Sequence, residues 1–94
     1  MNPAGVWIAG GYQSDFARNL TRENRNLADL VAETVTETLH DARIDAADVG
    51  VIHVGNAFGQ LYTGQGHLGG MPASVLPELW GIPATRHEGA CASG

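Results

Sequence analysis

The chain has 94 residues, of which 44% are hydrophobic and 16% are charged, and its formal net charge at pH 7 is −5. A chain of this length forms at most one domain with a small core. The acidic balance, without a basic stripe, argues against binding to nucleic acid or to an anionic membrane.

The predicted location of the protein is the cytoplasm. No window approaches the roughly 18 consecutive apolar residues that a membrane-spanning helix needs. The N-terminal segment, which begins at Met1, lacks the basic flank and the long apolar run of a signal peptide. A single cysteine cannot form an internal disulfide, which agrees with a reducing compartment.

The first predicted elements are a strand and a loop. Residues 6–9 are a short apolar run closed by Gly10 and Gly11, a pattern typical of a buried strand that enters a loop. The loop, over about residues 12–25, is polar and carries three of the five basic residues.

An amphipathic helix is predicted next. Asn26 can cap it, Asp29 suits the positive end of the helix dipole, and Arg43 ends it. The acidic side chains fall on the face opposite the apolar ones, so we interpret them as a solvated surface. The apolar positions are Leu27, Leu30, Val31, Val35, Leu39 and Ala42, and the acidic positions are Glu33, Glu37 and Asp41.

The second half of the chain repeats the alternation of strand and helix. Residues 49–55 are almost continuously apolar, which predicts a strand covered on both faces by helices. A glycine-rich loop over 59–70 leads to a helical stretch over 72–80, which Pro77 either kinks or divides into two pieces. A polar strand over about 84–88 follows.

This order of elements predicts an α/β fold with a mainly parallel sheet in an α/β/α layering. Sheets of this kind are usually wider than three strands. We therefore expect residues 1–94 to be one partial domain, the opening β-α-β-α-β part of a larger one.

The sequence ends on "HEGACASG", which holds Cys91. A cysteine just after a strand, at the start of a helix, sits where free backbone N–H groups and the helix dipole favour a thiolate. The same N–H groups can hold the oxyanion that forms when a thiolate attacks a thioester. Small neighbours leave room for the substrate. The alternative is a structural role, because free cysteine is commonly a small buried hydrophobe.

The segment "EGACASG" resembles the nucleophile segment of the thiolase superfamily, most of all the sterol-carrier-protein thiolases and acetyl-CoA acetyltransferases. The resemblance extends over nearly the whole chain. It includes "VWIAGGYQSDFAR", "DAADVGVIHVGNAFG" and "TGQGHLGGMPASVLPELWGIPA", which are similar to the family's first strand and loop, its second strand, and the loop and helix before the nucleophile strand.

The resemblance implies a thiolase-like fold and a role for Cys91 as the acyl-accepting nucleophile. The reaction would be thiolysis of a 3-oxoacyl-CoA or Claisen condensation, in lipid metabolism such as fatty acid degradation. Coenzyme A thioesters would be substrates, with no tightly bound cofactor, and the intact protein would be a homodimer. The family's other catalytic groups, two histidines and usually a second cysteine, come later in its chains, so we expect residues 1–94 alone to be inactive.

Two alternative functions stay open. One is a thiolase-fold subunit of a sterol or aromatic catabolic complex with a small partner subunit. The other is a non-catalytic interaction module in which Cys91 is only structural.

Two further patterns suggest binding sites. Residues 64–69 spell G-x-G-x-x-G, the dinucleotide-binding fingerprint, but the motif does not follow its strand directly, so we interpret it as a tightly packed loop. The histidines have no spacing typical of zinc ligands, and we expect no metal. We interpret His53 as a core histidine, His67 as a loop residue, and His87 as a strand residue that points alongside the sheet and does not reach the thiol.

Overall fold

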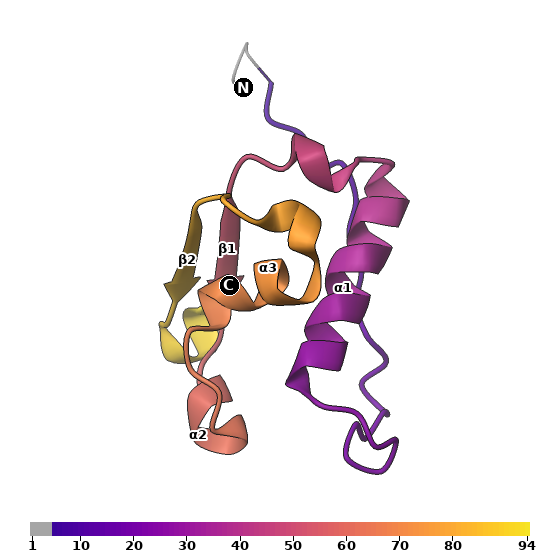
Figure 1. Cartoon of the computed structure of the whole chain (residues 1–94). Coiled ribbons are helices and arrows are strands. Elements are labelled where there is room, and N and C mark those ends of the chain that lie inside the picture. The colour runs from indigo at the N-terminus through magenta and orange to yellow at the C-terminus, as the bar shows by residue number, and fades with distance from the viewer. Residues whose placement is uncertain (1–4) are drawn as a thin grey trace.

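Two short parallel strands and one long helix organise the chain (Figure 1). The computed structural model describes residues 5–94; residues 1–4, on which the signal-peptide expectation partly rests, lie outside this range. The helices are α1 (Leu27–Ala42), α2 (Gly59–Thr63) and α3 (Met71–Val75), and the strands are β1 (Ile52–Gly55) and β2 (Ala84–His87). Short 3₁₀ turns cover Ala46–Asp48, Leu68–Gly70, Pro77–Leu79 and Ala90–Ala92.

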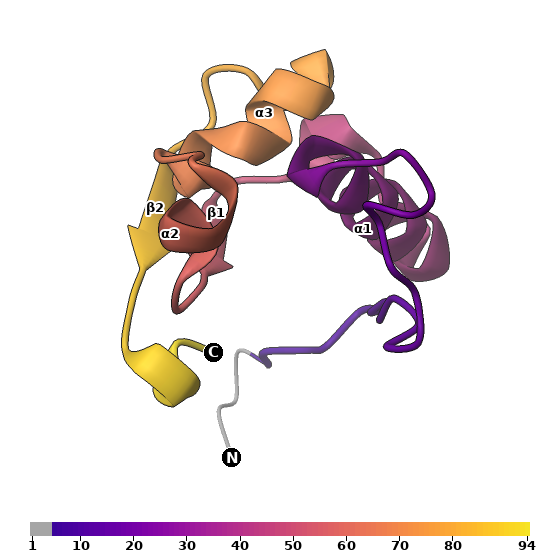
Figure 2. The same cartoon turned by 90° about the horizontal axis from the view of Figure 1, so that it is seen from below.

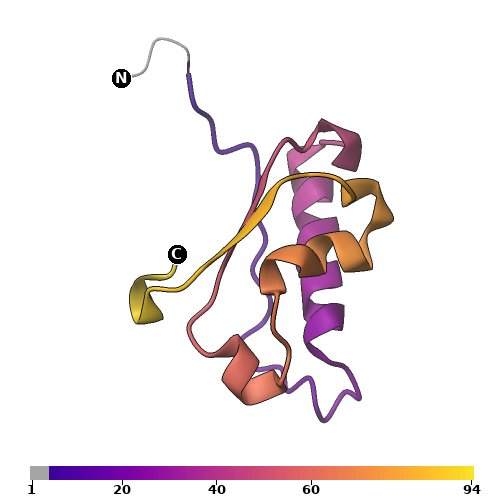
Figure 3. The ribbon, with the colours of Figure 1, turned by 60° about the vertical axis from the view of Figure 1, so that its left-hand side comes forward.

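The sheet confirms the predicted parallel α/β arrangement in its simplest form. β1 pairs with β2 in parallel, with Ile52 opposite Ala84 and Gly55 opposite His87. Helices α1 and α3 lie on one side of the strands, as Figures 2 and 3 show. The prediction of a strand covered on both faces is wrong for this chain, because the second face has no helix among the described residues.

The strand predicted at residues 6–9 is not formed. Val6, Trp7 and Ile8 have extended, unpaired backbone and are 86%, 86% and 98% exposed. The two glycines that follow the segment meet the end of α1, where the Gly11 N–H donates to Asp41. A strand needs backbone partners on a neighbouring strand, and none lies beside residues 6–9 in the described part of the chain.

Helix α1 begins and ends where the sequence predicts. The Asn26 side chain accepts from the Asp29 N–H, and Asp29 accepts from the Asn26 N–H, so the two residues form a capping box. Arg43 ends the helix in the left-handed conformation, at φ 56°. The helix is therefore defined by its own local sequence.

The core is small. Among the described residues, the buried apolar side chains are Leu68, Met71, Pro72 and Leu79. The apolar face of α1 is only half-buried, and it lines a hollow of about 550 Å³ together with β1 and Leu79. Two four-residue strands and short helical turns are too small to cover a helix of 16 residues.

Pro77 divides the second helical stretch, as one of the two predicted alternatives states. α3 ends at Val75, and Pro77 starts a separate 3₁₀ turn that carries Leu79 into the core. Within residues 5–94, no helix combines the length and the apolar character needed to cross a membrane.

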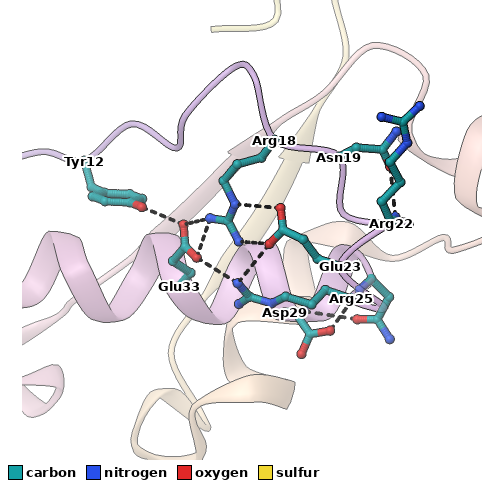
Figure 4. Close-up of polar contacts among 9 residues, drawn as sticks. Tyr12, Arg18, Asn19, Arg22, Glu23, Arg25, Asp29 and Glu33 are labelled. Carbon is teal, nitrogen blue, oxygen red and sulfur yellow. Dashed lines mark hydrogen bonds and ion pairs between the residues drawn. The ribbon is translucent and has the colours of Figure 1, made fainter.

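A cluster of charged side chains fastens the loop over residues 12–25 to α1 (Figure 4). In this Arg18 cluster, Arg18 donates to both carboxylate oxygens of Glu33 at 2.7 Å and to Glu23 at 2.9 Å. Arg25 and Tyr12 also donate to Glu33. The interpretation of Glu33 as part of a solvated face is therefore wrong, because basic loop residues 15 and 8 positions earlier fold back onto it.

The Arg18 cluster should make stability depend on acid pH. The hydrogen bond from Arg18, followed by that from Tyr12, lowers the pKa of Glu33 from its ordinary value of 4.5 to about 2. A lowered folded-state pKa stabilises the fold above pH 4.5, and this stabilisation is lost as the pH falls toward 2. Glu33→Gln should therefore lower the urea midpoint at neutral pH and flatten its dependence between pH 4.5 and 2.

The matched control for this prediction is Glu37→Gln, the same change at an exposed position of the same helix. It should leave the urea midpoint at neutral pH, and the change of that midpoint between pH 4.5 and 2, close to those of the wild type. Equal effects of the two substitutions would show that the cluster does not stabilise the loop.

Candidate functional site

Cys91 lies on a tight turn at the carboxyl end of β2. Its thiol is exposed and free, so the alternative of a small buried hydrophobe does not describe it in this structure. The turn comprises Gly89 and the 3₁₀ residues Ala90–Ala92. The carboxyl ends of parallel strands are where α/β folds commonly place their binding sites.

Two polar side chains of the same segment hold the turn in shape. Glu88 accepts from the Ala90 N–H at 2.6 Å, and the Ser93 hydroxyl accepts from the Gly89 N–H at 2.9 Å. The Ser93 hydroxyl also lies 2.6 Å from the Ala90 carbonyl, to which it donates. These roles of Glu88 and Ser93 are not among the predictions from the sequence, although side chains of this kind commonly bond to nearby backbone.

The helix predicted to start at Cys91 stays a prediction, because such a helix would extend past Gly94. Among residues 5–94 there is a single 3₁₀ turn at this place, and the Gly89 and Ala90 N–H groups are bonded to Ser93 and Glu88. A macrodipole and a row of free N–H groups require a regular helix. The helix dipole therefore provides no argument for Cys91 in this structure.

Ala90 holds a strained conformation directly before Cys91. Its φ is 52°, in the left-handed region that residues with a Cβ rarely adopt. Such a residue costs about 1–2 kcal/mol, and residues of this kind cluster at functional sites. The surrounding hydrogen bonds therefore impose the shape of the turn.

The end of β1 supports the turn from the other strand. The Asn56 N–H donates to the His87 carbonyl at 3.1 Å, and the Ser93 hydroxyl lies 3.3 Å from the Asn56 carbonyl. The Asn56 side chain accepts from the Gly59 N–H at 3.1 Å and so holds the start of α2. Asn56 thus joins both strand ends, the Cys91 turn and α2.

Gly55 is a close-packing position next to the turn. A Cβ at Gly55 would lie 2.5 Å from the Ser93 carbonyl oxygen, closer than any real Cβ contact. Gly55→Ala should therefore displace the backbone that follows Cys91. Because misplacing a reacting group by about 1 Å can cost as much as ~10²-fold in rate, we expect a changed rate of alkylation of the Cys91 thiol by iodoacetamide.

Gly50→Ala provides the comparison for Gly55→Ala, since a Cβ at Gly50 meets nothing within 4 Å. It should retain the wild-type alkylation rate in the same assay. Wild-type rates in Gly55→Ala would contradict a role for the contact between Gly55 and Ser93.

The histidines are arranged differently from the predictions. His53 is exposed on the open face of the sheet, so its interpretation as a core histidine is wrong. His87 is on β2 as predicted, and its ring pairs with that of His53 across the strands at 2.8 Å. His67 is a loop residue as predicted, at the start of a 3₁₀ turn. Residues 5–94 contain no group of three or more side chains suited to hold a metal ion.

The glycine-rich loop packs against the sheet. A Cβ at Gly69 would lie 3.0 Å from the Arg86 nitrogen and 3.1 Å from the Thr85 carbonyl carbon, so glycine lets the loop approach β2. The loop follows α2 rather than a strand, which differs from the geometry of the dinucleotide-binding fingerprint. The interpretation of residues 64–69 as a tightly packed loop is confirmed at Leu68 and Gly69, which are buried, and is wrong at Gly64 and Gln65, which are exposed. The first part of the loop predicted over 59–70 instead forms helix α2.

The fold and the site define a small α/β unit that presents one exposed thiol on a constrained turn after a parallel strand. No protein-family model matches the chain. It is 38% identical over 92 residues, 95% of its length, to an acetyl-CoA acetyltransferase of Methanocaldococcus jannaschii. It is 36% identical over 66 residues, 70% of its length, to an acetyl-CoA acetyltransferase of Methanothermobacter thermautotrophicus.

These matches confirm the predicted resemblance: the chain is a relative of the acetyl-CoA acetyltransferases of the thiolase superfamily. It spans 22% and 17% of the lengths of the two relatives.

Proposed function

We propose that the protein containing this chain is a thiolase-type acyltransferase that acts on acyl-CoA thioesters, with Cys91 as its nucleophile. The observation that carries the proposal is the match of 95% of the chain to an acetyl-CoA acetyltransferase. The exposed thiol on a constrained turn supports it, because nucleophilic catalysis requires an accessible thiol in a defined position.

The proposed reaction has two transfers. The Cys91 thiolate attacks the thioester carbonyl, the bond between that carbon and the coenzyme A sulfur breaks, and an acyl group remains on the Cys91 sulfur. In Claisen condensation, a second acyl-CoA that has lost a proton from its α-carbon attacks this acyl group; the new C–C bond forms, the bond to the Cys91 sulfur breaks, and the thiolate leaves. In thiolysis, the thiolate attacks the 3-oxo carbon of a 3-oxoacyl-CoA, the bond between C2 and C3 breaks, and the acetyl-CoA carbanion takes up a proton; the thiol of coenzyme A then takes the acyl group from Cys91, which leaves as the thiolate.

Other parts of the proposal concern the whole protein. We propose a cytoplasmic homodimer that acts in lipid metabolism, such as fatty acid degradation, without a tightly bound cofactor. Residues 1–94 would be the opening part of its catalytic domain and would be inactive alone. The base that deprotonates Cys91 would come from a separate part of that protein.

The test is mass spectrometry of the full-length protein after brief exposure to acetyl-CoA. We expect one acetyl group on the peptide that contains Cys91, and its removal when free coenzyme A is added. A protein that remains unmodified, or that carries the acetyl group on another residue, would refute the assignment of Cys91.

A further inference from the structure

Two histidine rings meet on the open face of the sheet. Successive side chains of a strand alternate between its faces, and the register puts His87 opposite Gly55, two residues beyond His53. Nδ1 of His53 lies 2.8 Å from Nε2 of His87, and the stacked ring centroids are 5.0 Å apart. One ring donates its N–H and the other accepts, so the pair ties β1 to β2 through side chains.

This histidine pair lies at the start of a hydrogen-bonded path to the Cys91 turn. The His87 carbonyl accepts from the Asn56 N–H, and the Asn56 carbonyl lies within hydrogen-bond distance of the Ser93 hydroxyl. Ser93 in turn bonds to Gly89 and Ala90. A change in how β2 lies against β1 would therefore reach the residues on both sides of Cys91.

The histidine pair and the turn also share one hollow. It has a volume of about 540 Å³ and is lined by both histidines, by Gly55 and by residues 88, 89 and 92–94, whereas Cys91 is not among its lining residues. The charged side chain in its lining is Glu88, which also holds the Ala90 N–H.

Few other contacts hold the end of β2 in place. All four residues of β2 are exposed, and among residues 5–94 its only partner strand is β1. A single exposed hydrogen bond adds little to global stability. Its effect on the local position of the next few residues can be larger, because β2 ends at His87 and the turn begins two residues later.

We propose that His53 and His87 are positioning residues for Cys91, whose pairing fixes the end of β2 and thereby the turn that carries the thiol. The inference rests on the proposed function, because it concerns the reactivity of the same cysteine. It gives the two exposed rings a role that acts through the backbone, without contact to the reacting atoms.

The experiment compares His53→Ala, His53→Asn and Thr85→Ala in the full-length protein. Asparagine places an amide near the position of the histidine Nδ1, so it can restore the hydrogen bond. Thr85 is the register partner of His53 and lies outside the Cys91 turn, so it controls for the general loss of a side chain on this face. Two rates are measured: acetylation of Cys91 in a single turnover, and alkylation of Cys91 by iodoacetamide.

We expect His53→Ala to slow acetylation about tenfold at saturating acetyl-CoA, with KM changed by less than about twofold, because positioning acts on the chemical step. The acetylation rate of His53→Asn should lie within about threefold of the wild-type rate, and that of Thr85→Ala should equal the wild-type rate. The alkylation rate should change in His53→Ala and be restored in His53→Asn.

Wild-type acetylation and alkylation rates in His53→Ala would overturn the proposal, and so would equal losses in His53→Ala and Thr85→Ala. A wild type that alkylates at Cys91 but never acetylates there would refute the proposed function instead. In that case, an altered alkylation rate in His53→Ala would still support the link between the pair and the turn, and an unaltered rate would overturn it.

Discussion

Cys91→Ala in the full-length protein is expected to abolish acyl-enzyme formation and to lower kcat by on the order of 10³-fold or more, because the nucleophile of a covalent mechanism has no substitute. Cys91→Ser should also be strongly impaired, since a hydroxyl is a much weaker nucleophile than a thiolate at neutral pH. Cleavage of a 3-oxoacyl-CoA by coenzyme A measures kcat, and mass spectrometry measures the covalent adduct.

The cysteine variants should leave stability unchanged, because the Cys91 side chain is exposed. Urea midpoints within error of the wild type would separate a chemical loss from an unfolded protein. Activity within about tenfold of the wild type in Cys91→Ala would place the nucleophile elsewhere, because known nucleophile deletions cost far more.

Leu79→Ala is expected to cause the largest loss of stability of any single side-chain truncation. Leu79 is 2% exposed, the lowest value among the buried apolar side chains of residues 5–94. Removing a buried leucine side chain costs about 2–5 kcal/mol, from lost burial and from the cavity that remains. Leu79 already borders the hollow beside α1, so few neighbouring side chains can move in to fill the new cavity.

Urea denaturation followed by circular dichroism would measure this loss. Leu61→Ala is the matched control, because Leu61 on α2 is 78% exposed and the chemical change is the same. Its effect should stay within about 0.5 kcal/mol. A Leu79→Ala variant as stable as Leu61→Ala would mean that the contact between the Pro77–Leu79 turn and the rest of the chain contributes little.

Both expectations follow from the separate roles of the core and of the Cys91 turn. The core around Leu79 sets the position of the sheet, and the sheet carries an exposed, constrained turn at one end. Loss of the core should remove the whole arrangement, whereas loss of the thiol should remove only the chemistry.

Several elements could be predicted because their causes are local. The ends of α1 follow from Asn26 with Asp29 and from Arg43, all within a few residues of the helix termini. The division at Pro77 follows from the missing N–H of proline. The relationship to the acetyl-CoA acetyltransferases could likewise be inferred from the residues around Cys91, and it is confirmed by the comparisons.

Other predictions failed where distant residues decide the outcome. The apolar run over 6–9 has the composition of a buried strand, yet its backbone has no strand partner here and its side chains are exposed. Glu33 has the spacing of a solvated helix face, yet the loop residue Arg18, 15 positions earlier, donates to its carboxylate.

The sequence by itself determined the helix with its caps, the two strands that follow it, the family relationship and the position of the single thiol, because these depend on neighbouring residues or on the residue types. Only the tertiary structure decided that Glu33 binds Arg18, that helices cover one face of the sheet, and that His53 meets His87. Those two histidines are 34 positions apart, and their contact exists only because the parallel register of β1 and β2 brings them together.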